Sequence, residues 1–249
     1  MLKYSQQTLI YTRYFAKVMG RNPTVLIYTI GLPIFFLILN TAGHFFKPLT
    51  PIQYAANVAP FISWMIFSSA LQAVSAVAIL REQGYLKQYQ SLVTSPSVIL
   101  VAETLISFIQ LGISITLVGG LSGLVFNLPV LPLLAELWLT LLLSFPAAVC
   151  FCLPLLAFSA REKTVDALVN LISIGVVFAS FGLAAVMTPA IQNPLFNILS
   201  PLFLGSFIFR ALVSQIGAYL LTYIISLIVL GIVGYLSYRH LKLLPAEVI

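Results

Sequence analysis

Long runs of apolar residues with almost no charge, separated by short polar segments, follow one another along the whole chain. A helix needs about 20 apolar residues, at about 1.5 Å each, to cross a hydrocarbon core of about 30 Å. Six runs reach that length, and the pattern predicts that each forms a membrane-spanning helix. They cover residues 24–43, 58–80, 98–128, 132–160, 164–188 and 214–238. We therefore expect an all-α polytopic membrane protein with a single transmembrane domain, residues 1–249.

A seventh apolar stretch, residues 189–209, contains Pro189, Pro194 and Pro201. Proline removes a backbone hydrogen bond from a helix interior and clashes with the preceding turn, so three prolines this close together interrupt a continuous helix. We predict short, broken re-entrant helices on the outer face in place of a seventh span. Arg210 follows directly and belongs to the same outer region.

Residues 2–22 precede the first run and have an amphipathic pattern. Apolar positions such as Leu9 and Phe15 alternate with basic ones such as Arg13 and Lys17. A helix lying in the membrane interface buries one such face in lipid and keeps the other in water. We expect an N-terminal interface helix, and the alternative is a solvated tail.

Six spans would divide the basic residues unevenly between the two sides of the membrane. One side receives only Lys47 and Arg210. The other side receives the remaining basic residues: Lys3, Arg13, Lys17, Arg21, Arg81, Lys87, Arg161, Lys163, Arg239 and Lys242. Because cytoplasmic segments carry the excess of Lys and Arg, both termini are predicted to be cytoplasmic.

The composition supports a chain embedded in lipid. Hydrophobic residues make up 61% of it, charged residues 7%, and the mean hydropathy is +1.08, whereas a soluble domain has about 25% charged residues. So few charges exclude a soluble enzyme, a secreted disulfide scaffold and a nucleic-acid-binding domain. Cys150 and Cys152 are expected to be buried thiols, and no metal site is expected because His44 and His240 lie far apart and no acidic cluster accompanies them.

The most polar stretch lies between the second and third runs, over residues 82–93. Gly84 and Ser95 bracket room for a short helix, which would carry an apolar and aromatic stripe. The stripe consists of Tyr85, Leu86, Tyr89 and Leu92. Such a stripe presses either against the bilayer interface and the chain's own span ends or against a cytoplasmic partner protein.

The interiors of the spans contain almost no charge, which bears on the source of energy. Ion-coupled carriers usually hold an ionisable residue at mid-membrane depth, whereas Glu103 and Glu136 lie near the ends of their spans. The sequence also contains no G-x-x-x-x-G-K-[ST] loop for ATP. Any uphill transport would therefore draw on a separate chain.

Milder polar side chains recur at helical spacing in two spans. In the second span they are Ser68, Gln72 and Ser75, and in the fifth span they are Asn170, Ser173 and Ser180. Hydrogen bonding between helices is one reading of these faces. The other is a weakly polar wall for an amphiphilic cargo. The small faces Gly119-x-x-x-Gly123 and Gly175, Ala179 and Gly182 are expected to permit close helix packing.

A different chemistry is suggested by Gly120-Leu121-Ser122-Gly123, which has the G-x-S-G form of intramembrane serine hydrolases. A serine nucleophile needs a histidine base close by. Only His44 and His240 exist, in the outer loop and beyond the last span, so this alternative ranks below a transporter.

The order of these features resembles the membrane permease subunit of type-2 ATP-binding cassette (ABC) exporters. Arg21-Asn22-Pro23 is similar to the motif that closes the N-terminal interface helix of that family, and Leu32-Pro33 to its first span. Arg81-Glu82-Gln83-Gly84-Tyr85-Leu86 with Leu92 and Ser95-Pro96 is similar to the segment between spans two and three. Ser200-Pro201-Leu202-Phe203 with Arg210 resembles the stretch before the last span.

The resemblance implies a permease that forms an export pathway for a drug, lipid, peptide or polysaccharide in the inner membrane of a prokaryote. The partners would be two copies of a cytoplasmic ATPase, which holds the ATP and Mg²⁺, and a second permease copy in a homodimer or related heterodimer. Residues 82–93 would form the coupling helix, and the second and fifth spans would line the pathway. The coupling residues would be Arg81, Glu82, Gly84, Tyr85, Leu86, Tyr89 and Leu92. An ATP-independent carrier or channel remains the main alternative.

Overall fold

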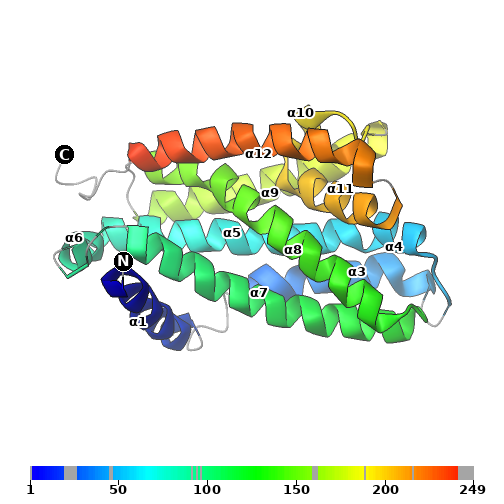
Figure 1. Ribbon diagram of the computed structural model, residues 1–249, viewed down its shortest axis with the longest axis horizontal. Coiled ribbons are helices and arrows are strands. Elements are labelled where there is room, and N and C mark those ends of the chain that lie inside the picture. The colour runs from blue at the N-terminus through cyan, green and yellow to red at the C-terminus, as the bar shows by residue number, and fades with distance from the viewer. Residues whose placement is uncertain are drawn as a thin grey trace.

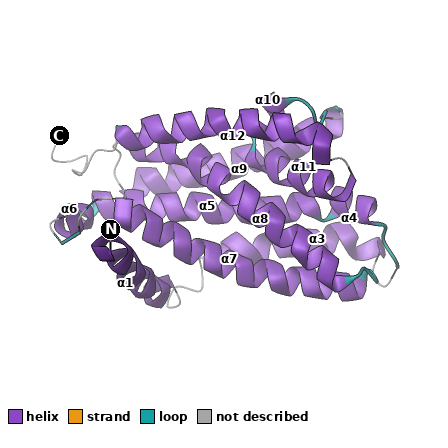
Figure 2. Ribbon diagram, in the orientation of Figure 1, coloured by secondary structure: helices purple, strands orange, loops and turns teal. Residues whose placement is uncertain are grey.

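Helices account for all the regular structure in the described part of the chain (Figure 2). The computed structural model describes residues 2–19, 27–44, 47–90, 92–93, 95, 97–158, 162–187, 189–214 and 216–240. Within these residues, five helical segments are long and apolar enough to cross a membrane. They are α5 (Ala59–Glu82), α7 (Ser97–Val125), α8 (Val130–Cys152) with its 3₁₀ extension η3 (Leu153–Ala157), α9 (Glu162–Val186) and α12 (Ile216–Arg239). The chain is therefore a multi-pass membrane protein.

The first predicted span is shorter than the other five in the described residues. It comprises the π-helical turn η1 (Ile27–Gly31), α3 (Leu32–Thr41) and the 3₁₀ turn η2 (Ala42–His44). Pro33 near the start of α3 accounts for the wide turn before it, because its ring displaces the carbonyl four residues earlier. Residues 24–26 of the predicted span, and Arg21-Asn22-Pro23, lie outside the described residues, so a sixth span stays a prediction.

The long helices lie side by side, and α5 runs through the middle of the bundle (Figure 1). It contacts α7, α8, α9 and α11 (Pro201–Ser214). In its most apolar window 72% of residues are buried. A helix that is hydrophobic all round belongs in a core, and the alanines and serines of α5 let its neighbours approach closely.

The predicted N-terminal helix is present as α1 (Leu2–Met19), which packs against α7. Its Leu9 and Ile10 are exposed beside Arg13, whereas Phe15 is buried. At the same end of the bundle lie the short helix α6 (Tyr85–Gln90) and the last turn of α12 (Figure 1). The basic residues of α1 and Arg239 at the end of α12 therefore lie at one end of the bundle (Figure 1).

The opposite end holds three short helices: α4 (Pro51–Asn57), α10 (Pro194–Leu199) and α11 (Figure 1). Between α10 and α11, Ser200 is extended, so the apolar stretch is broken as predicted. However, α11 continues to Ser214, five residues beyond the predicted boundary, and the last long helix begins at Ile216. A capping box between Thr50 and Gln53 starts α4, and the Thr-x-x-Gln spacing could have predicted it.

The two small-residue faces have different surroundings. A Cβ added at Gly119 would lie 2.6 Å from Leu137 Cδ1, and one at Gly112 would lie 2.6 Å from the Trp138 ring. The face of α7 is thus filled by α8, which confirms close packing there. At Gly175 and Gly182 of α9 an added Cβ would meet no described atom within 4 Å.

Candidate coupling junction and transport seam

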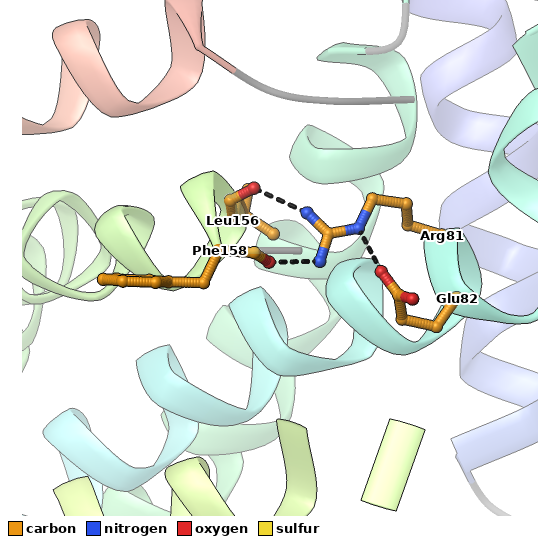
Figure 3. A network of polar contacts seen from close by, with 4 residues as sticks. All are labelled: Arg81, Glu82, Leu156 and Phe158. Carbon is orange, nitrogen blue, oxygen red and sulfur yellow. Dashed lines mark hydrogen bonds and ion pairs between the residues drawn. The ribbon is translucent and has the colours of Figure 1, made fainter. Parts of the chain in front are cut away.

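A buried arginine ties the end of α5 to the end of the α8–η3 segment (Figure 3). The Arg81 guanidinium donates from Nη1 to the Leu156 carbonyl at 2.6 Å and from Nη2 to the Phe158 carbonyl at 2.5 Å. Its Nε donates to Glu82 Oε1 at 2.7 Å. The side chains of Arg81 and Glu82 are 0% and 4% exposed. We name these four residues the coupling junction.

The hydrogen bonds of the coupling junction follow from the unpaired carbonyl groups at the end of a helix. The last carbonyls of a helix have no partner within the helix, and arginine offers several N–H donors in a fixed planar fork. Arg81 satisfies two carbonyls where η3 ends, and Glu82 balances its charge. The guanidinium is fully enclosed, so it holds two helical segments together and does not lie on the surface.

Within the segment predicted to form a coupling helix, residues 82–93, the structure contains the shorter helix α6, which contacts α5. Gly84 has φ +77° and forms the turn between α5 and α6, a conformation that glycine adopts at little cost. Leu86 is fully buried, whereas Tyr85 and Leu92 are exposed. The side chain of Tyr89 lies outside the described residues. Of the predicted stripe, Leu86 thus packs into the bundle, whereas Tyr85 and Leu92 lie on the surface.

The residues predicted to line a pathway differ in how far they are buried. On α5, Ser68 and Ser75 are buried, and the Ser75 hydroxyl donates to the Gln72 carbonyl at 2.9 Å. On α9, Asn170 is exposed, Ser173 is half-buried and Ser180 is buried. We call the contact between these two helices the α5–α9 seam.

Two cavities flank the α5–α9 seam. At the end near α4 and α11, a cavity of about 400 Å³ is lined by apolar groups together with Ser180, Ser206 and Arg210. Near the coupling junction, an apolar cavity of about 510 Å³ is lined by residues including Leu71, Phe151 and Phe158. Apolar walls with a few polar groups suit an amphiphilic molecule.

Buried polar contacts hold the broken outer segment in place. The Ser180 hydroxyl lies 2.6 Å from the Ser200 hydroxyl, which joins α9 to the break before α11. Asn197 of α10 is fully buried, and its amide donates to Tyr219 at 2.9 Å and to Ser226 at 3.2 Å on α12. Asn197 was not among the predicted site residues, although an asparagine in an apolar stretch commonly marks a buried hydrogen-bonding position.

Ser122, the candidate nucleophile, belongs to a structural contact. It is buried, lies 2.8 Å from the Tyr54 hydroxyl, and donates to the Gly119 carbonyl at 3.2 Å. Burial raises the pKa of Tyr54 to about 12, so the phenol stays protonated at neutral pH and cannot serve as a base. The ring of His240 contacts the Leu236 carbonyl at 2.8 Å, and the side chain of His44 lies outside the described residues.

Searches for relatives of this chain found no match among protein-family models, curated proteins or solved structures.

Proposed function

We propose that this chain is the permease subunit of an ABC exporter and moves an amphiphilic cargo with energy from a separate ATPase. Two cytoplasmic ATPase copies and a second permease copy would complete the transporter in the inner membrane of a prokaryote. ATP and Mg²⁺ would bind to the ATPase. The observation that carries the proposal is the coupling junction beside α6.

In this proposal the coupling junction transmits movement of α6 to the rest of the bundle. Tyr85 and Leu92 are exposed on and just after α6, where an ATPase would press, whereas Leu86 is buried against the bundle. Arg81 lies one turn before α6 and bonds the backbone at Leu156 and Phe158, immediately before α9. A push on α6 would therefore reach α5 and the base of α9 together. Arg81, Glu82 and Leu86 would transmit the motion, and Tyr85 would receive it.

The α5–α9 seam supports a pathway for amphiphiles. Its two cavities are mainly apolar, with hydroxyls and one arginine at the outer end. Movement of α9 relative to α5 would join them into a passage, because coupled transport requires two discrete packings biased by nucleotide. Ser200 and Pro201 break the outer helices where that passage would open.

The test uses the chain co-expressed with an ABC ATPase, taken from the neighbouring gene if one is encoded there. A photo-crosslinking residue at Tyr85 should capture that subunit, whereas the same residue at Tyr235, exposed near the end of α12, should not. Tyr85→Ala should lower transport-linked ATP hydrolysis about tenfold, the effect of losing about 1.4 kcal/mol of coupling. Tyr235→Ala should leave it unchanged.

Uphill transport by this chain alone in proteoliposomes, without a nucleotide-hydrolysing partner, would refute the proposal and favour the ATP-independent carrier. Capture of the ATPase from Tyr235 and not from Tyr85 would place the contact elsewhere than α6.

A further inference from the structure

A row of polar side chains follows one face of α7. Glu103, Ser107 and Gln110 are spaced i, i+4 and i+7, which places them on the same side of the helix. Ser114 continues the row by one turn, in the direction of the outer half of α7. The proposed transport pathway uses none of these residues.

The inner part of the row is buried without partners in the described structure. Glu103 and Ser107 are 7% and 2% exposed. Ser107 Oγ and Gln110 Oε1 are buried and make no hydrogen bond to the described residues. The ion pair found in the described part of the chain is Arg81–Glu82, so Glu103 has no cationic partner there. A carboxylate and an unbonded amide oxygen together call for hydrogen-bond donors and positive charge.

The outer part of the same face opens into an apolar groove of about 490 Å³ between α7 and the η1–α3 segment. On α7, Ser114, Leu117, Leu121 and Val125 line it, and their spacing continues the face that carries Glu103. Leu117 and Leu121 are more than half exposed, so the groove is open at its side. Along this face of α7, the polar acceptors Glu103, Ser107 and Gln110 are thus followed by the apolar groove, which begins at Ser114.

We infer that this face of α7 is a lateral binding site for an amphiphile whose head carries a protonated amine. The ammonium N–H groups donate to the Glu103 carboxylate and to the unbonded oxygens of Ser107 and Gln110. The apolar tail lies in the groove between α3 and α7. The ligand is either a membrane lipid with an amine headgroup or a free amphiphilic amine, since both present this chemistry.

The inference does not depend on the proposed function, because binding at equilibrium needs neither nucleotide nor ATPase. Glu103→Gln keeps the size of the side chain and removes a buried charge, so the variant is expected to fold. Glu136→Gln is the matched control, because Glu136 also lies near one end of a long apolar helix but faces away from this groove, toward Tyr54 and Phe209.

The experiment titrates purified protein in detergent with octadecylamine and, as an uncharged match, octadecanol, because Leu117 lies about 21 Å from Glu103 along α7 and a much shorter chain would not reach it. Glu103→Gln should weaken octadecylamine binding about tenfold and leave octadecanol unchanged. Leu117→Trp should weaken both, because it fills the groove, and Glu136→Gln should change neither. Equal loss in the two glutamate variants, or wild-type affinity in Glu103→Gln, would overturn the site.

Native mass spectrometry of protein purified from membranes separates the two sources. A retained amine-headgroup lipid that is lost in Glu103→Gln supports a lipid site. Saturable octadecylamine binding without a retained lipid supports a site for free amphiphilic amines. If neither a retained lipid nor octadecylamine binding is observed, the inference is wrong.

Discussion

The two helices predicted to line a pathway together, α5 and α9, have opposite surroundings. Buried residues make up 72% of the apolar window of α5 but 11% of that of α9. Both helices are apolar enough to cross a membrane, so hydrophobicity does not distinguish them. The difference lies in their neighbours: α5 is enclosed on all sides by other helices, whereas Leu171, Phe178 and Val186 of α9 face outward. A helix in a membrane can be apolar because it faces protein or because it faces lipid or a second subunit.

The largest expected effect is at the coupling junction, which anchors the inner end of α5. Arg81→Ala leaves the carbonyls of Leu156 and Phe158 without its donors and Glu82 without a cation. Breaking a buried charged contact costs about 3–5 kcal/mol. The free energy of unfolding in detergent should fall by this amount. Arg13→Ala, which removes an exposed cation of α1, is the control, and an equally small change in both variants would contradict an anchoring role.

A matched pair of alanine substitutions compares the packed side of α5 with the open side of α9. At Gly205 an added Cβ would lie 2.6 Å from Ser63 Oγ and 2.9 Å from Ser63 Cβ, so Gly205→Ala should destabilise the protein by about 1–3 kcal/mol. Gly175→Ala meets no described atom and should stabilise the helix by about 0.5–1 kcal/mol.

Thermal unfolding of both glycine variants in the same detergent measures the difference. A loss of stability in Gly175→Ala would show that a neighbour covers this part of α9.

Substitutions of Ser180 and Asn170, toward opposite ends of α9, are expected to have smaller effects. They test whether these two polar residues have different roles. Ser180→Ala removes the contact with Ser200 and should cost about 0.5–1.5 kcal/mol of unfolding free energy. Asn170→Ala, at an exposed site, should stay within about 0.5 kcal/mol of wild type. If Asn170 lines the pathway, its substitution should lower transport in reconstituted vesicles without changing stability. If instead Ser180→Ala lowers transport without changing stability and Asn170→Ala lowers stability, Ser180 lines the pathway and Asn170 has the structural role.

Sequence reasoning predicted the elements better than their contacts. Apolar runs and Pro194 and Pro201 located the long helices and the break before α11, because hydrophobic period and proline chemistry act locally. The short helix after Gly84 was also predicted. The partners of Arg81 were not, because two of them are backbone carbonyls that lie 75 and 77 positions away in the chain. Sequence spacing carries no information on such contacts.

The predicted site residues show the same limit. Ser68 and Asn170 look alike in the sequence, as single polar side chains in apolar runs, yet one is buried and the other exposed. Which face of a helix meets protein depends on the three-dimensional order of the bundle. The roles of α6 and of the α5–α9 seam in transport remain predictions.

The acceptors of Arg81 have a consequence for how this protein can evolve. Every residue offers the same main-chain oxygen, so replacing Phe158, whose ring is largely exposed, leaves the bond from Arg81 available. Leu156 is fully enclosed, so only its size and shape are restricted. Relatives of this chain are therefore expected to retain an arginine at this helix end, with a side chain of similar size at position 156 and any residue at position 158.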